Sequence, residues 1–293
     1  MNALVTDAVI ASGLEVAELE RVVATALAED LRYGPDLTSE ATIPARSSTR
    51  AAVVARQRGV LCGHVVALAV LDAVDFPLEG ATAVRLDGTP IEPGEAVLAL
   101  DGPVHSLLLA ERTMLNLMTH LSGIATATER WVRELAGTTC EVRDTRKTTP
   151  GLRQLEKYAV RCGGGTNHRL GLGDAALLKD NHIAAAGGIA RAVTAIRREH
   201  PDVVLEVECD TLDQVREALD ADCSLIMLDN MDTDAIAAAV EFIRRVPGVL
   251  VEASGSMTLE RARSVAQTGV DYIAVGSLTH SVTALDLGLD VVS

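Results

Sequence analysis

The chain has 293 residues, of which 48% are hydrophobic and 23% are charged, so it can bury a large core and is neither disordered nor fibrous. This length suits one barrel or two domains of ordinary size. The net charge of −15 and the aromatic content of 2% argue against nucleic-acid and anionic-membrane binding.

The first hundred or so residues mix helical and strand-like patterns. Helices are predicted over 16–28 and 64–74, and strands over 48–57, 81–86 and 96–100. Residues 29–44 are predicted as a loop because they are polar and contain Pro and Gly. We expect residues 1–11 to fray. The mixture predicts an α+β domain with a small sheet, placed at 1–115.

From residue 104 to 135 the apolar pattern is helical, with a break predicted at Ser122-Gly123. Short apolar runs then alternate with amphipathic helices, and most run centres lie about twenty to twenty-four residues apart, the length of one β/α unit. The runs lie at 140–142, 176–178, 205–207, 225–228, 249–251 and 272–275.

A doubly wound sheet would give the same local pattern. Polar residues directly after the apolar runs favour a barrel, whose chemistry collects at the carboxyl ends of its strands. We therefore predict an α/β fold: an incomplete α/β barrel of about six strands over 116–293, after the N-terminal α+β sheet domain. Packing of the C-terminal tail back on that first domain is left open.

Five scattered cysteines, without a C-x-x-C pair or zinc-ligand spacing, favour reduced, buried thiols. The start of the chain lacks the pattern of a secretory signal, and no run of eighteen apolar residues occurs. We expect a cytoplasmic protein.

Basic residues gather between 143 and 182 of this acidic chain. Arg146 and Lys147 follow a predicted strand, His168 and Arg169 lie in a Gly-rich loop, and Lys179 ends another strand. Any one of them alone would ordinarily form surface ion pairs. Their shared placement favours one cavity for an anionic ligand, and the mixture of Arg and Lys suits carboxylate and phosphate groups together.

Two acids end buried strands: Glu208 in LEVE and Asp229 in MLDN. A carboxylate there is costly unless it binds something. Beside a phosphate site, such a pair suggests Mg²⁺, held directly or through water, or hydrogen bonds to sugar hydroxyls. Solvated loop acids are the alternative interpretation.

Glycine-containing segments at 163–165, 254–256 and 276–277 could present backbone N–H groups to phosphate, and the last two precede helical patterns. The segment 171–176 matches G-x-G-x-x-A but leads into a strand, so it fails as a dinucleotide fingerprint.

A series of short motifs runs along nearly the whole chain. Their order and spacing resemble those of the quinolinate phosphoribosyltransferase family, the decarboxylating nicotinate-nucleotide pyrophosphorylases of NAD synthesis. They are ERTMLNLMTHLSGIAT, DTRKTTPGLR, GGGTNHRLGLGD, LLKDNHI, LEVE, MLDNM, VEASG and VGSLTHS. The resemblance implies that phosphoribosyl pyrophosphate and quinolinate react to give nicotinate mononucleotide, pyrophosphate and CO₂. It also implies Mg²⁺ and a homodimer in which each subunit completes the other's site.

The resemblance implies a role for each matching residue. Quinolinate would be held by Thr145, Arg146, His168, Arg169 and Lys179, with Arg112 of the partner subunit. Lys147, Glu208 and Asp229 would be catalytic and address the phosphoribosyl donor, the two acids also holding Mg²⁺. The phosphate would lie on Ser254, Gly255, Ser256, Val275, Gly276 and Ser277. Ser256 departs from the Gly or Asn expected in the family.

Two other functions remain open. A paralogous pyrophosphorylase on the same fold could take another substrate, although the complete basic set argues against it. A silent phosphometabolite-binding barrel would not require both Glu208 and Asp229.

Overall fold

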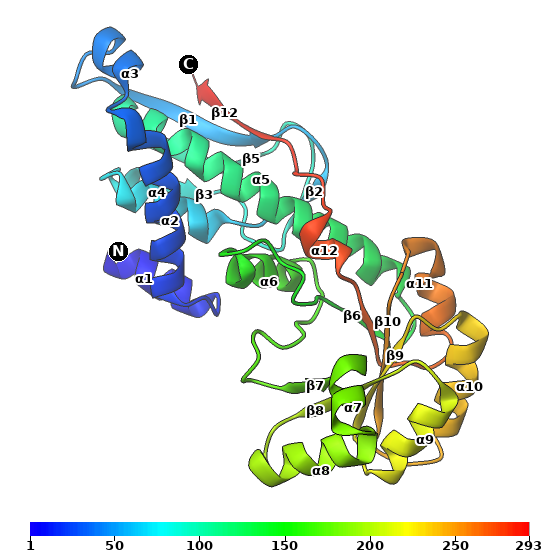
Figure 1. The fold of residues 1–293 in the computed structure, drawn as a ribbon. Helices are drawn as coiled ribbons and strands as arrows, with labels where there is room; N and C mark the ends of the chain where they lie inside the picture. Colours follow the sequence, from blue (N-terminus) through cyan, green and yellow to red (C-terminus); the bar gives the residue numbers. More distant parts are fainter. Residues whose placement is uncertain (293) are drawn as a thin grey trace. The chain divides into compact units, whose positions relative to one another are not determined.

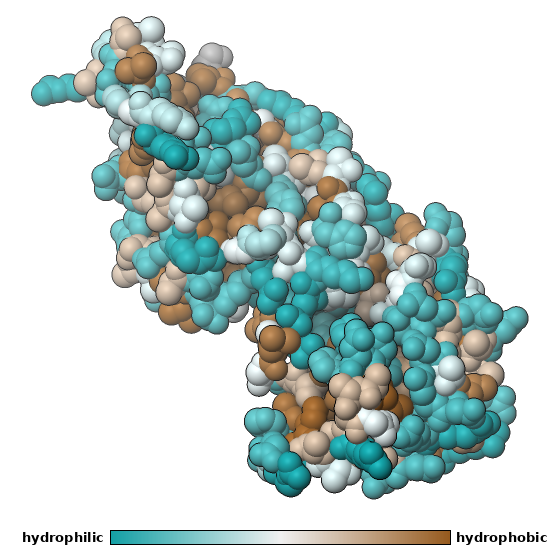
Figure 2. Space-filling view, viewed as in Figure 1, coloured by the Kyte–Doolittle hydropathy of each residue, from teal (hydrophilic) through white to brown (hydrophobic). Residues whose placement is uncertain are grey.

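The computed structural model describes residues 1–292, which form two compact units (Figure 1). The first comprises Met1–Glu129, Thr148–Gly164 and the chain from Leu278 onward, and the second comprises Arg130–Lys147 and Gly165–Ser277. The described residues contain no helix long and apolar enough to cross a membrane. Figure 2 shows a mostly hydrophilic face, as expected for a strongly charged chain.

The first unit contains a four-stranded antiparallel sheet in the order β12-β1-β5-β3. Its strands are β1 (Ser48–Ala55), β3 (Ala81–Ala83), β5 (Ala96–Pro103) and β12 (Leu287–Val292), and a two-stranded sheet joins β2 (Gly59–Val60) to β4 (Pro90–Ile91). β12 comes from the end of the chain, and its Val292 pairs with Arg50 of β1. The sheet therefore combines strands from residues 48–103 with a strand from residues 287–292.

Helices of the first unit bury apolar side chains, and in α4 every residue from Val65 to Leu71 is buried. The helical segments are α1 (Ala3–Ala11), α2 (Val16–Asp30), η1 (Leu31–Tyr33), α3 (Leu37–Thr42), α4 (His64–Ala73), η2 (Leu78–Gly80), α5 (Val104–Glu134) and α6 (Arg153–Cys162). The last residues of α5 belong to the second unit, as does the first residue of α12 (Ser277–His280).

Two predictions about the beginning of the chain are wrong. Residues 3–11 form a helix because Asn2 accepts the N–H of Leu4 as its cap and Val5 and Val9 are fully buried. Within the predicted loop, α3 forms because the Asp36 carboxylate accepts two backbone N–H groups of its first turn. Six residues are too few to give a helical period in the sequence.

The predicted break in α5 is also wrong, since this helix continues through Ser122 and Gly123. The Ser122 hydroxyl accepts the Cys62 N–H at 2.9 Å and donates to its carbonyl oxygen at 3.0 Å. A Cβ on Gly123 would lie 2.4 Å from the carbonyl oxygen of Thr283. Both residues thus permit close packing inside the unit and do not end the helix.

The second unit contains six parallel strands in the order β6-β11-β10-β9-β8-β7. They are β6 (Glu141–Arg143), β7 (Ala176–Leu178), β8 (Leu205–Cys209), β9 (Leu225–Asp229), β10 (Leu250–Ser254) and β11 (Tyr272–Ala274). The edges are formed by β6 and β7, the first two strands of this unit along the chain, so the ring is open between them. The predicted incomplete α/β barrel of six strands is confirmed.

Helices follow β7 to β10 in the chain: α7 (Asp180–Ala186), α8 (Ile189–Glu199), α9 (Leu212–Asp220), α10 (Thr233–Ile243) and α11 (Leu259–Ala266). They bury small and branched side chains, for example Val193 of α8 and Ala239 of α10. All five cysteines are free thiols, four of them buried, as the sequence predicts.

Candidate active site

A cavity of about 490 Å³ lies in the second unit and is lined only by residues of that unit. The predicted site residues in its lining are Thr145, Arg146, Lys147, His168, Arg169, Lys179, Glu208, Asp229, Ser254, Gly255 and Ser256. The other lining residues are Leu177, Met227, Asn230, Glu252 and Ala274. The structure therefore gathers most of the predicted residues around one space.

Strand register explains why these residues meet. Parallel strands bring their carboxyl ends to one edge of the sheet. Glu208 of β8 pairs with Met227 of β9, and Asp229 at the end of β9 pairs with Ser254 at the end of β10. Lys179 directly follows β7 and Thr145 lies two residues past β6. The sheet edge thus supplies acids, a cation and hydroxyl groups to one cavity.

Arg146 and Arg169 form the basic wall. The Nε atoms of both are buried and have no hydrogen-bond partner among the described residues. Burial and the neighbouring Arg146 lower the pKa of Arg169, because two like charges lie close together. Buried donors without partners beside each other fit a ligand that carries more than one carboxylate.

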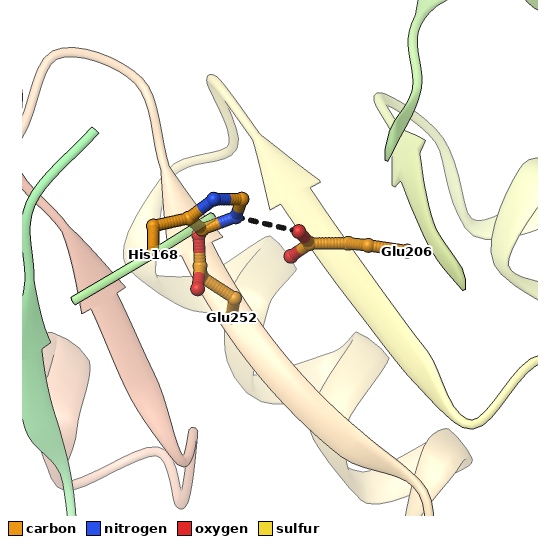
Figure 3. Close-up of side chains that lie close together, drawn as sticks. All are labelled: His168, Glu206 and Glu252. Atoms are coloured by element: carbon orange, nitrogen blue, oxygen red, sulfur yellow. Dashed lines mark hydrogen bonds and ion pairs between the residues drawn. The ribbon is translucent and has the colours of Figure 1, made fainter. Parts of the chain in front are cut away.

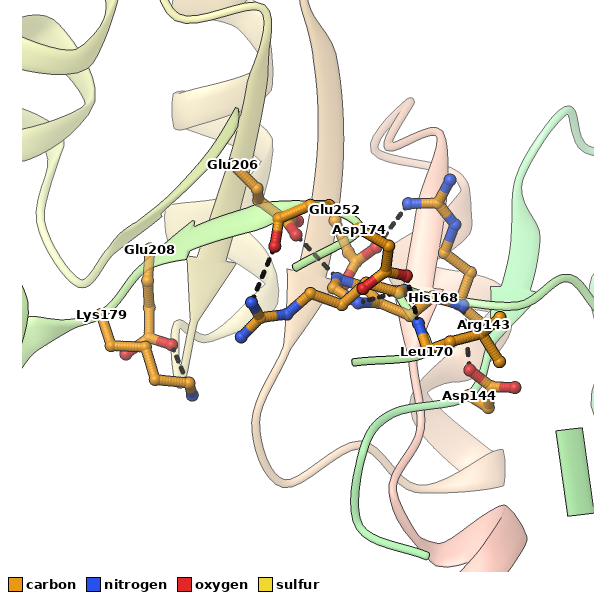
Figure 4. Close-up of polar contacts among 11 residues, drawn as sticks. Arg143, Asp144, His168, Leu170, Asp174, Lys179, Glu206, Glu208 and Glu252 are labelled. Carbon is orange, nitrogen blue, oxygen red and sulfur yellow. Dashed lines mark hydrogen bonds and ion pairs between the residues drawn. The ribbon is translucent and has the colours of Figure 1, made fainter. Parts of the chain in front are cut away.

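Lys179 and Glu208 link the basic and acidic sides of the cavity. The Lys179 ammonium donates to Glu208 Oε2 at 3.2 Å, as Figure 4 shows. The lysine side chain is 49% exposed and the glutamate 10%, so this ion pair faces open space on its lysine side. A ligand that contacts both charges would therefore bind across this pair.

Acidic groups are concentrated at the ends of the neighbouring strands. Burial, then the charges of Asp229 and Asp180, raises the pKa of Asp210. The Asp229 carboxylate accepts the side-chain amide of Asn230 at 2.6 Å. Since Mg²⁺ prefers carboxylate oxygens and offsets repulsion among acids, Glu208 and Asp229 fit such an ion.

The segment Ser254–Ser256 passes close to the end of β9. Gly255 has φ +107°, and a Cβ there would lie 2.5 Å from Asn230 Oδ1 and 2.8 Å from its backbone nitrogen. Glycine is required for this approach. The other predicted phosphate segment, Val275–Ser277, is not in the cavity lining, and the Val275 N–H donates to the Arg143 carbonyl oxygen at 2.9 Å.

Comparison with known proteins identifies the family of this chain. The family models of the N-terminal and C-terminal domains of quinolinate phosphoribosyl transferase match residues 36–122 and 124–290. The nicotinate-nucleotide pyrophosphorylase (carboxylating) of Mycobacterium leprae is 51% identical over 269 residues, 91% of this chain and 94% of that protein. The chain belongs to the quinolinate phosphoribosyltransferase family.

Other relatives agree. The probable nicotinate-nucleotide pyrophosphorylase (carboxylating) of Bacillus subtilis is 43% identical and covers 90% of each chain. The solved structure of the Francisella tularensis nicotinate-nucleotide pyrophosphorylase is 38% identical, with a TM-score of 0.88, covering 95% of this chain and 98% of that one. The family predicted from the motifs is confirmed.

Arg112, which the family resemblance assigns to the partner subunit's site, lies on α5 in the first unit. Its side chain is 65% exposed, and its Nη2 lies 3.8 Å from Oε1 of Glu111. A guanidinium this exposed is held by a weak ion pair and can contact another chain.

A largely buried cluster, defined here as Arg143, His168, Glu206 and Glu252, adjoins the cavity, and its members His168 and Glu252 also line it. His168 Nε2 lies 2.7 Å from Glu206 Oε2 and 3.7 Å from Glu252 Oε1 (Figure 3). Arg143 donates to Glu252 at 3.0 Å (Figure 4). The Arg143 guanidinium lies 3.3 Å from the centre of the Tyr272 ring. Two buried acids of the parallel sheet are thus paired with Arg143 and with the His168 ring.

Sequence reasoning missed Glu206 and Glu252. Burial, then the charge of Glu206, raises the pKa of Glu252 to about 7, while His168 and Arg143 act in the opposite direction. The sequence signal that could have found them is a glutamate inside each of two apolar strands, Glu206 in LEVEC and Glu252 in LVEAS. Such a residue is rarely buried without partners.

Proposed function

We propose that the protein transfers the phosphoribosyl group of phosphoribosyl pyrophosphate to quinolinate, with release of nicotinate mononucleotide, pyrophosphate and CO₂. One observation carries the proposal beyond family membership. The cavity that holds the acids Glu208 and Asp229 also holds Arg146 and Arg169, whose buried Nε donors have no partner among the described residues. A dicarboxylate acceptor beside a pyrophosphate donor uses both groups.

The acceptor lies on the basic wall. Arg146, Arg169 and Lys179 bind the two carboxylates of quinolinate, with Thr145 beside them. Arg112 of the partner subunit completes this set in a homodimer. Guanidinium groups bind carboxylates through two parallel hydrogen bonds, so they fix the plane of the ring as well as its charge.

The phosphoribosyl donor lies on the acidic side. Lys147 neutralises the pyrophosphate, and backbone N–H groups of Ser254–Ser256 bind the 5′-phosphate. Glu208 and Asp229 would hold Mg²⁺, directly or through water, and bound Mg²⁺ would neutralise charge on the pyrophosphate.

The chemistry needs no protein base to form the new bond. The ring nitrogen of quinolinate donates its electron pair to C1 of the ribose as the C1–oxygen bond to pyrophosphate breaks. Glu208 and Asp229 stabilise the positive charge that develops on the ribose ring. The nitrogen becomes cationic, so the bond to the adjacent carboxylate can break to release CO₂. The electron pair stays on the ring carbon, and a proton from water replaces the carboxylate.

The first test follows product formation from quinolinate, phosphoribosyl pyrophosphate and Mg²⁺, with nicotinate in parallel because it lacks the second carboxylate. We expect nicotinate mononucleotide and CO₂ from quinolinate alone. Turnover of nicotinate would indicate the paralogous activity, and turnover of neither would indicate a silent binding barrel. Chelation of Mg²⁺ should abolish turnover, and added Mg²⁺ should restore it.

A further inference from the structure

His168 uses both of its ring nitrogens inside the protein. Its Nδ1 accepts the backbone N–H of Arg169 at 2.9 Å, and its Nε2 lies 2.7 Å from Glu206 Oε2. Because a backbone N–H can only donate, Nδ1 carries no proton, and the ring proton is on Nε2 and is donated to Glu206. Neither nitrogen is free to donate to a quinolinate carboxylate.

The neighbouring acids affect the protonation of the His168 ring. Burial lowers the pKa of His168, but the hydrogen bond to Glu206 and the charges of Glu252 and Glu206 outweigh burial and raise it. A second ring proton would nevertheless sit on Nδ1, where it would face the Arg169 N–H donor. The geometry therefore corresponds to a neutral imidazole whose orientation Glu206 fixes.

Hydrogen bonds hold the chain on both sides of Arg169. The His168 N–H donates to Asp144 at 2.9 Å, and the N–H groups of Leu170 and Gly171 donate to the Asp174 carboxylate at 2.6 and 2.8 Å. The Arg169 guanidinium donates to the Ala175 carbonyl oxygen at 2.8 Å. The backbone N–H of Arg169 itself donates to His168 Nδ1.

We propose that Glu206 and His168 are positioning residues that act through Arg169. Glu206, backed by Glu252 and Arg143, fixes the His168 ring, and the ring holds the Arg169 backbone so that its guanidinium meets a carboxylate of the acceptor. The inference rests on the proposed function, in which Arg169 binds the acceptor dicarboxylate. It differs from the sequence prediction, in which His168 itself binds quinolinate.

The tautomer is tested by NMR of the full protein labelled with ¹⁵N-histidine, with the His168 signals assigned by their loss in His168→Gln. We expect at pH 7 one unprotonated nitrogen, Nδ1, and one protonated nitrogen, Nε2. Protonation of both nitrogens, or of Nδ1 alone, would overturn the proposal. This measurement does not depend on the substrate.

The action through Arg169 is tested by double-mutant cycles on the Kd of quinolinate, measured by calorimetry. His168→Gln keeps an N–H for Glu206 but removes the acceptor for Arg169, so we expect Kd to rise roughly tenfold, the cost of one lost hydrogen bond. With Arg169→Gln already present, the same change should alter Kd less than about twofold, whereas with Arg146→Gln it should again give roughly tenfold. Equal effects in both backgrounds contradict the proposal.

Variants of Glu206 test the acid. Glu206→Gln keeps an acceptor oxygen, so Kd should stay within about threefold, whereas Glu206→Leu leaves the buried Nε2 donor unpaired and should raise Kd roughly tenfold. If Glu206→Gln raises Kd as much as Glu206→Leu does, the charge of Glu206 matters and its hydrogen bond does not, which would contradict the proposal. Thermal melting checks folding, and the exposed His200→Gln is the matched control. If the unmodified protein neither binds nor converts quinolinate, the proposed function fails, while the NMR result still decides the tautomer.

Discussion

Glu206 and Glu208 lie two positions apart on β8 and face the same side of the sheet, yet their surroundings differ. Glu208 belongs to a cavity layer, defined here as Arg146, Arg169, Lys179, Glu208 and Asp229, whose charges line open space. Glu206 belongs to the buried cluster, whose charges meet one another. The cavity layer can exchange its present partners for ligands. The buried cluster supports the cavity layer, and exchanging its partners would leave buried charges unpaired.

The largest expected effect comes from the cavity layer. Arg146→Ala should lower kcat/KM for quinolinate roughly 10³-fold, because truncating one member of a buried charge pair costs about 2–5 kcal/mol. Asp229→Ala should instead act mainly on kcat/KM for phosphoribosyl pyrophosphate. Steady-state kinetics with each substrate varied separates the two. If both variants affect the two substrates alike, the division between the basic and acidic sides is wrong.

Mixed dimers test whether the cavity layer is complete within one chain. Arg112→Ala and Lys179→Ala should each be inactive, but unfolding and refolding them together should restore about a quarter of the activity. Half of randomly paired dimers are mixed, and each has one intact site of two. Activity of the mixture is compared with each variant refolded alone. Mixtures that remain inactive would place Arg112 outside the site.

The buried cluster should govern stability more than turnover. Because the pKa of Glu252 is about 7 in the folded protein and about 4.5 as an ordinary carboxyl, the folded state holds this proton more tightly, so stability falls as pH rises from about 4.5 to 7. Glu252→Gln should remove this slope, worth up to roughly 3 kcal/mol. Urea unfolding at several pH values measures it. An unchanged slope in the variant would show that Glu252 is ionised throughout.

The smallest effect should come from the phosphate segment. Because backbone N–H groups bind the phosphate there, Ser256→Gly should change the KM of phosphoribosyl pyrophosphate less than about twofold. Kinetics at saturating quinolinate measures this value. A much larger change would assign the binding to the Ser256 hydroxyl and not to the backbone.

The two layers were not equally predictable from the sequence. The regular spacing of apolar runs and the polar residues after them predict the strands and most of the cavity layer, because strand ends converge in any parallel sheet. Partners inside the sheet depend on which strands are neighbours, and the pattern within one strand does not give that order. Hence Arg146 and Asp229 were predicted, while the contact of Glu252 with Arg143 was not. Motif resemblance alone supplied the role of Arg112. The segment 276–277 was also predicted from its glycine, but it does not line the cavity.

The pairing of β12 with β1 has a consequence for how the chain folds as it is synthesised. The edge strand of this sheet forms only when residues near 290 are available to pair with residues near 50. The hydrogen bond from Arg56 to Asp290 has the same requirement. The residues of β1 therefore cannot pair on this side until residues 287–292 have been synthesised. Contacts so distant in sequence slow folding, and a variant that lacks residues 287–292 would expose the edge of β1 to pairing with other chains.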